Sequence, residues 1–206
     1  MFMKNLLITL FLISAIIIDM SAQDKNTTKD SQGLPYYQIP DYPESYTPEN
    51  VAARMIDGLG FRYYWATEGL TEKDLEYTPG NEGRSTGHTI DHIYGLTLTI
   101  VNASLNKPNV FPRDNEELTF EQKRARTLEN IEKASQVLNN QNANTLENNK
   151  VIFQSDNGTS EYPYWNMING PIADAIYHTG QVVSFRRSSG NPINPNIRQL
   201  LGTFRE

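Results

Sequence analysis

Two pairs of side chains, each spaced by one helical turn, carry the strongest chemical signal in this sequence. His88 and His92 form one pair, and Asp174 and His178 form the other. If the two segments are helical, both members of a pair lie on one face and can converge on a single ion. Imidazole nitrogens and carboxylate oxygens are common ligands of divalent metals. The same spacing also fits histidines that merely occupy a core or cap a helix, so both interpretations stay open at this point.

The composition narrows the chemistry further. The chain contains no cysteine, which excludes disulfides, thiolate metal ligands and cysteine nucleophiles, so any metal must use nitrogen and oxygen ligands. The formal net charge is -6, and an acidic protein is a poor ligand for nucleic acid. The one basic cluster, Lys123, Arg124 and Arg126, lies close to several glutamates in the sequence. We interpret it as a solvated helix face and expect no nucleic-acid partner.

Four segments combine helical apolar periodicity with capping residues, and these must position the two pairs. They are expected at about 47–65, 85–105, 119–138 and 167–189, and Gly190 is expected to stop the last one. Four helices of this length predict an all-α fold, a four-helix bundle. Such bundles often build metal sites from side chains that face one another across the core. The pair in the second helix can therefore meet the pair in the fourth.

The segment between the third and fourth helices is expected to be irregular or partly extended. It spans about 151–165 and contains the turn signal Asn157-Gly158. No segment has enough alternation of β-branched residues to require a sheet. In the last turn of the fourth helix, Arg186 and Arg187 place positive charge where the helix dipole favours it, with substrate anchoring as the alternative. Glu68, near the end of the first helix, is expected to be solvated, with contact to a core site as the alternative.

The amino terminus has the pattern of a cleavable secretory signal peptide. Lys4 precedes an apolar run at 6–18, and small residues follow up to Ala22, so cleavage is expected before Gln23. The apolar run is too short to span a bilayer. We therefore expect an exported protein, periplasmic or secreted, that is soluble and keeps no stable membrane anchor after cleavage.

Three regions follow from this organisation of the chain. Residues 1–22 are the predicted signal peptide, residues 23–46 a flexible or extended lead-in rich in proline and tyrosine, and residues 47–206 the helical-bundle domain. The tyrosines of the lead-in are expected to pack against the domain, with an aromatic recognition strip as the alternative.

Two separate segments resemble a known family. Ser85-Thr-Gly-His-Thr-Ile-Asp-His-Ile is similar to the second-helix segment of the DinB-like (DinB/YfiT) metalloenzymes, which commonly reads Ser-Ile-Gly-x-x-x-x-His-Ile. The segment from His178 to Pro192 resembles the His-x-Gly-Gln, Arg-Arg and Gly-x-Pro signature of the fourth helix in that family. The resemblance extends over roughly 47–192 and implies a four-helix bundle of the DinB/YfiT type.

The resemblance also implies a divalent metal held by three side chains, at the positions of His92, Asp174 and His178. Asp174 departs from the family pattern, which usually has a third histidine there. Zinc suits this ligand set, with manganese, nickel and iron as alternatives. His88 is an additional nitrogen that would act as a fourth ligand, as a general base or only as a residue at the rim. Gln181 shares the stripe of His178 and would orient a ligand or hold substrate, unless it is simply a buried polar residue.

Three protein ligands would leave positions on the metal for water and substrate. We therefore expect an exported metal-dependent hydrolase or transferase that acts on an unidentified small molecule. The alternative is an exported metal-binding or interaction protein without turnover. Some relatives transfer thiol cofactors, a chemistry that export makes less expected here. Members of the family are often dimers, and the sequence leaves a homodimer open.

Overall fold

The computed structural model describes residues 28–113, 116–141 and 145–205. The predicted signal peptide and the first residues of the lead-in lie outside this part of the chain. Within the described residues, none of the helices is both long enough and apolar enough to cross a membrane.

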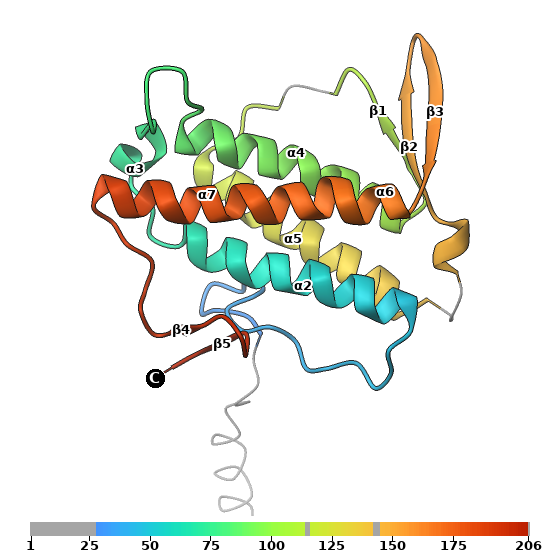
Figure 1. The fold of residues 1–206 in the computed structure, drawn as a ribbon, viewed down its shortest axis with the longest axis horizontal. Coiled ribbons are helices and arrows are strands. Elements are labelled where there is room, and N and C mark those ends of the chain that lie inside the picture. Colours follow the sequence, from blue (N-terminus) through green and yellow to red (C-terminus); the bar gives the residue numbers. More distant parts are fainter. Residues whose placement is uncertain (1–27, 114–115, 142–144, 206) are drawn as a thin grey trace, which may run out of the picture.

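Long helices dominate the described structure and lie side by side as a bundle (Figure 1). They are α2 (Pro48–Thr67), α4 (Thr86–Ser104), α5 (Phe120–Asn139) and α7 (Ala173–Ser189). Around the bundle, α2 contacts α5, α5 contacts α4, α4 contacts α7, and α7 contacts α2. The short helix α3 (Glu72–Glu76) packs against the ends of α4 and α7. The predicted helical bundle is therefore present.

The predicted capping residues explain where these helices begin and end. The side-chain oxygens of Thr47, Ser85 and Thr119 each accept a hydrogen bond from the backbone N–H three residues later. These contacts satisfy donors that an uncapped first turn would leave without a partner. At the other end of α7, Gly190 has a φ of 101°, a left-handed conformation that costs glycine little. Local sequence thus explains the start of α4 and the end of α7, the two helices that carry the pairs.

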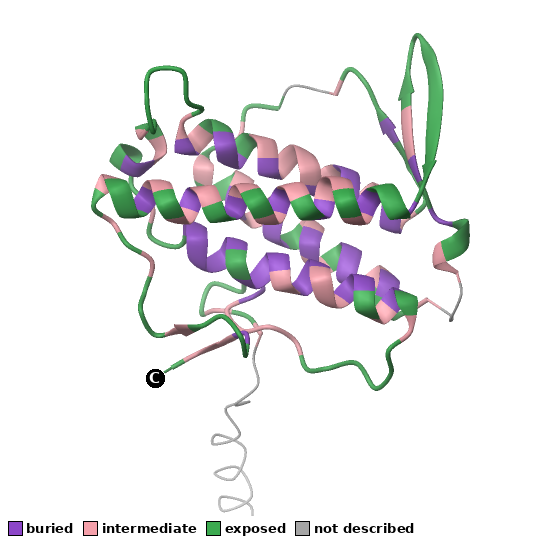
Figure 2. Cartoon of the chain, in the orientation of Figure 1, coloured by how far each residue is buried: buried purple, intermediate pink, exposed green. Residues whose placement is uncertain are grey.

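The core lies between the inward faces of the long helices, as the buried stripes in Figure 2 show. Aliphatic side chains from α2, α4 and α5 fill it and are fully or almost fully buried. The largest of them are Ile56, Leu59, Ile90, Ile93, Ile100, Leu128, Ile131 and Leu138. Their burial follows the periodicity that predicted the helices.

A small sheet corrects the expectation of a purely α-helical fold. β1 (Pro108–Val110) pairs in parallel with β2 (Lys150–Ser155), and β2 pairs antiparallel with β3 (Gly158–Pro163). Asn157-Gly158 does form the turn between β2 and β3, as predicted. The strands escaped prediction because β3 is exposed along its whole length. A strand without a buried face shows no alternation of apolar and polar residues.

The fourth predicted helix is interrupted rather than continuous. It consists of α6 (Trp165–Met167), a π-helical turn at Ile168–Ile172, and then α7. Gly170, with φ -100° and ψ -107°, leaves the helical conformation directly before Pro171. Proline lacks a backbone N–H and disfavours the α conformation in the residue before it. The interruption ends at Ile172, two residues before Asp174.

The lead-in and the C-terminal segment are joined to each other and to α2. Tyr36 is buried, and the ring of Tyr37 lies 5.2 Å from that of Trp65. The ring of Phe204 completes this cluster: it stacks on Trp65 at 5.0 Å with an inclination of 11°, and it lies 5.7 Å from the ring of Tyr37. Phe204 belongs to a two-stranded sheet of β4 (Ile197–Arg198) and β5 (Thr203–Phe204).

Only part of the tyrosine-rich lead-in packs as expected. Tyr36 and Tyr37 contact the bundle, whereas Tyr42 and Tyr46 are 75% and 98% exposed. The guanidinium carbon of Arg54 lies over the ring of Tyr42, 4.7 Å from the ring centre. The packing interpretation therefore holds for the first two tyrosines and not for the later two.

Candidate metal centre

Three side chains from two helices converge on one point of the bundle. α4 supplies His92, and the first turns of α7 supply Asp174 and His178. Nε2 of His92 lies 3.1 Å from Oδ2 of Asp174, and Nε2 of His178 lies 3.3 Å from Oδ1 of the same carboxylate. The two imidazole rings are 4.7 Å apart and nearly perpendicular. One ligand atom from each residue lies within 4.8 Å of the others.

These distances fit a divalent ion. Zinc binds nitrogen and oxygen at about 2.0–2.2 Å, which places the donors of a tetrahedral site about 3.4 Å from one another. The two histidine–aspartate distances of 3.1 and 3.3 Å are close to that value. The side chains of His92 and Asp174 are 36% and 42% exposed, and that of His178 is 14% exposed. An ion held here would therefore face solvent on one side.

Gln181 orients one of the candidate ligands. Its Oε1 lies 2.7 Å from Nδ1 of His178, and because the partner is an oxygen, the ring proton belongs on Nδ1. Nε2 of His178 is then left with the lone pair that a metal requires. Nε2 of Gln181 donates in turn to the hydroxyl of Tyr177 at 3.2 Å. Tyr177 had no part in the sequence-based site, although it precedes His178 in the chain.

His88 lies outside the converging group. It occupies the first turn of α4, its side chain is exposed, and its backbone N–H donates to the Ser85 cap. Among the described residues, the group that could hold an ion consists of His92, Asp174 and His178 alone. The roles suggested for His88, as a fourth ligand or a general base, therefore have no contact that supports them.

An open hollow of about 490 Å³ adjoins Asp174. It lies between α4 and the interrupted helix, and it reaches from Asp174 and Tyr177 to Leu96 and the turn at Gly170-Pro171. Sequence reasoning did not find this hollow, although Gly-Pro inside a predicted helix was a signal that the helix breaks there. Of the three converging side chains, Asp174 lines this hollow.

Other charged residues near these helices are engaged elsewhere. Asp91 pairs with Lys123 of α5, and Glu68 at the end of α2 pairs with Arg124. The side chain of Glu68 is partly exposed, as expected, and it is paired with the guanidinium of Arg124. It does not belong to the candidate centre. Among the described residues, Asp174 is the one acid that meets both histidines.

The solvated-face interpretation of the basic cluster is wrong for Arg124. Arg124 is 8% exposed, and it donates to the Thr67 hydroxyl and to the backbone oxygen of Tyr64. It therefore links α5 to the end of α2. Arg126 does pair with Glu116 at the surface, as expected. The sequence alone could not distinguish the buried Arg124 from the surface residue Arg126, because the partners of Arg124 come from a helix that is distant in the sequence.

Arg186 also has a different role from the one expected. It is 4% exposed, and its Nη1 donates to the backbone oxygens of Trp65 and Ala66 at 3.0 and 3.1 Å. Its Nε and Nη2 donate to the backbone and side-chain oxygens of Asn191. Arg186 lies in the last turn of α7, as expected, and it also fastens α7 to the end of α2, which the sequence did not predict. Arg187 is exposed, which fits the expectation.

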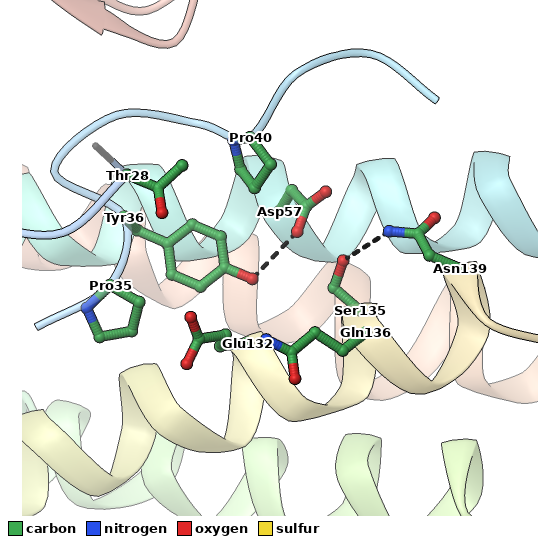
Figure 3. Close-up of a pocket in the computed structure, with 9 residues that line it drawn as sticks. All are labelled: Thr28, Pro35, Tyr36, Pro40, Asp57, Glu132, Ser135, Gln136 and Asn139. Atoms are coloured by element: carbon green, nitrogen blue, oxygen red, sulfur yellow. Dashed lines mark hydrogen bonds between the residues drawn. The ribbon is translucent and has the colours of Figure 1, made fainter. Parts of the chain in front are cut away.

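A second cavity, of about 260 Å³, lies under the lead-in, between α2 and α5 (Figure 3). The hydroxyl of Tyr36 points into it and donates to Oδ1 of Asp57 at 3.0 Å. Asp57 is almost fully buried, and this burial raises the pKa of its carboxyl. On the rim, Lys29 pairs with Glu132. We interpret the contacts around this cavity as the ones that hold the lead-in against the bundle.

Comparison with known proteins bears on the predicted resemblance. The DinB family model matches residues 62–196, which is more than half of the chain and includes all three converging residues. The recognition of this family from the two sequence segments is confirmed. Neither the curated proteins nor the solved structures contain a significant match.

Proposed function

Because this chain belongs to the DinB family, a metal-associated family, we propose that it holds a divalent transition metal with His92, Asp174 and His178. We further propose that it acts as an exported metal-dependent hydrolase or transferase. The observation that carries the proposal is the convergence of three ligand atoms within 4.8 Å. His92 and Asp174 are 82 residues apart in the chain, so this convergence is a property of the fold.

The ligand set suits an ion that keeps open positions. Asp174 supplies one negative charge, and His92 and His178 supply neutral nitrogens, so the centre would carry a net positive charge with a divalent ion. Such an ion supplies Lewis acidity and brings the pKa of water towards about 7. The residues of the protein would hold the ion and orient its ligands. Gln181, for example, fixes the ring of His178 through Nδ1.

Two nitrogens and one oxygen are compatible with several metals. Zinc favours this set in four-coordinate sites, and manganese, nickel and iron accept it in sites with more ligands. We propose zinc first, with the other three as alternatives. Metal content after purification without chelators identifies the ion.

The accessibility of the centre favours an enzyme over a protein that only stores or binds metal. The side chains of His92 and Asp174 are partly exposed, and the hollow beside Asp174 has room for a small molecule. A site that only stores metal is better served by full coordination and burial. This hollow is the specific observation that separates the two candidate functions.

Metal binding by matched histidine variants tests the proposal. The protein purified without chelators should contain about one equivalent of metal, and His92→Ala and His178→Ala should each lose it. His88→Ala is the control, because His88 is an exposed histidine on the same helix outside the group. Full metal content in His92→Ala or His178→Ala would contradict the assignment, and loss of metal in His88→Ala would make His88 a further ligand.

Turnover and export need separate measurements. Hydrolysis of a panel of esters and amides should disappear with a chelator and return with the metal, and failure across hydrolysis and group-transfer panels would favour the metal-binding alternative.

For export, mass spectrometry of the protein from a secreting host should find a chain that begins at Gln23. A retained full-length chain in the cytoplasm would contradict the signal-peptide proposal.

A further inference from the structure

The hollow next to the candidate metal centre has a distinctive lining. Most of its lining is apolar: Leu96 of α4, Pro171 of the π-helical turn, and Ala173 and Tyr177 of α7. Its neutral polar side-chain groups are the amide of Asn169 and the hydroxyl of Tyr177, and the hydroxyl accepts a hydrogen bond from Gln181. Among the described residues that line the hollow, Asp174 alone is charged.

The interrupted helix creates this lining. The turn at Gly170-Pro171 displaces the backbone just before α7 begins, so that the segment from Asn169 to Ala173 curves beside Leu96. Tyr177, one turn after Ala173, stays 63% exposed at the edge of the hollow. An exposed aromatic ring beside an open apolar surface is a common arrangement where a ligand supplies the missing contact.

We propose that this hollow binds an uncharged apolar part of the substrate, aromatic or aliphatic, while a polar group of the substrate faces His92, Asp174 and His178. This inference rests on the proposed function and specifies the class of its substrate. A charged substituent would find no opposite charge among the described lining residues and would lose hydration there.

The volume of the hollow is suited to a small molecule. Ligand sites typically have volumes of about 300–1,000 Å³, and this hollow, at about 490 Å³, falls in the lower half of that range. The amide of Asn169 can give and accept a hydrogen bond, so it accommodates a neutral polar group beyond the apolar part. The structure thus favours a compact neutral molecule with one reactive polar end.

Hydroxamic acids provide probes with a constant metal-binding group and a variable body. We would measure by calorimetry how zinc-loaded protein binds acetohydroxamic acid, benzohydroxamic acid and 4-carboxybenzohydroxamic acid. Benzohydroxamic acid should bind at least about tenfold more tightly than acetohydroxamic acid, because its ring buries apolar surface in the hollow. The added carboxylate should remove most of that gain.

Two variants locate the effect. Ala173→Leu fills the hollow with a good helix former at an exposed position, so it should abolish the preference for the ring. The affinity for zinc, measured in parallel, distinguishes this effect from damage to the metal centre. Ser184→Leu adds the same bulk to an exposed position of α7 away from the hollow and should change none of the three affinities.

Three results would overturn the inference, and they differ from one another. Equal binding of the acetyl and benzoyl probes, or a preference that survives Ala173→Leu, would reject the apolar hollow as a binding site while zinc binding still stands. Tighter binding of the carboxylated probe would assign an anionic substrate instead. Failure of the unmodified protein to bind zinc, manganese, nickel or iron would reject the proposed function itself, and this inference with it.

Discussion

Replacing Arg186 with methionine should strongly destabilise the protein while leaving the candidate metal centre in place. Methionine keeps much of the length of the side chain and removes the guanidinium. The arginine makes four hydrogen bonds, two to backbone oxygens of α2 and two to Asn191. The oxygens of Trp65 and Ala66 belong to the last turn of α2, where no later helical N–H is available to them.

The structure gives the size of the effect. Leaving a buried acceptor without a donor costs about 1–3 kcal/mol, and Arg186→Met leaves two of them, because the bonds that Nη1 gives to Trp65 and Ala66 are buried. Asn191 is only partly buried, so water can replace much of what it loses. We therefore expect the free energy of unfolding to fall by about 3–5 kcal/mol, which lowers Tm by roughly 10 °C in a chain of this size.

Urea unfolding of Arg186→Met beside Arg187→Met is the appropriate assay. Arg187 is the exposed neighbour on the same helix, so its replacement should change the free energy of unfolding by less than about 0.5 kcal/mol. Metal content should be the same in both folded variants. If the two variants are equally stable, Arg186 does not fasten α7 to α2, and our explanation of its burial is wrong.

Three further changes have defined outcomes. Gln181→Leu should weaken zinc binding by about 10–100-fold in competition with a chelator, because it removes the partner of a ligand imidazole; unchanged affinity would contradict that role. Burial alone would raise the pKa of Asp74, but hydrogen bonds from three side chains hold it well below its ordinary value of 3.8. The stability from this depressed pKa is present above about pH 4 and is lost as the pH falls further, so Asp74→Asn should lower Tm at pH 7 and flatten its acid decline; parallel Tm curves would refute this. Tyr36→Phe should cost about 1–3 kcal/mol at pH 7, since buried Asp57 loses its donor, and less in acid, where Asp57 is protonated; a loss that does not change with pH would count against this pairing.

The helices could be predicted because they depend on local sequence, and the converging group could be predicted because the family resemblance pointed to its three residues. Thr47, Ser85 and Thr119 cap their helices through side-chain contacts with the next turn, and apolar periodicity determined the buried faces. Once His92 lies on one long helix and Asp174 on another, only a few bundle arrangements remain, and the family resemblance selected the one that brings them together.

The features that escaped prediction depend on contacts between distant segments. Arg186 donates to two backbone oxygens of α2, and Arg124 donates to Tyr64 and Thr67 of the same helix. Nothing in the sequence around either arginine separates a buried cation bound to carbonyl oxygens from a solvated one. The strand β3 was missed because both of its faces are exposed. The hollow depends on the bend of the backbone at Gly170 and on the distance between this bend and Leu96. Apolar periodicity in the sequence predicts neither of them.

Anomalous X-ray diffraction from crystals of chelator-free protein tests the central claim most directly. Data collected on both sides of the absorption edge of the metal found in the sample locate that metal without assumptions. We predict one strong peak, about 2.0–2.2 Å from Nε2 of His92, a carboxylate oxygen of Asp174 and Nε2 of His178. A peak elsewhere in the molecule, or no peak after soaking with zinc, manganese, nickel and iron in turn, would contradict the metal centre.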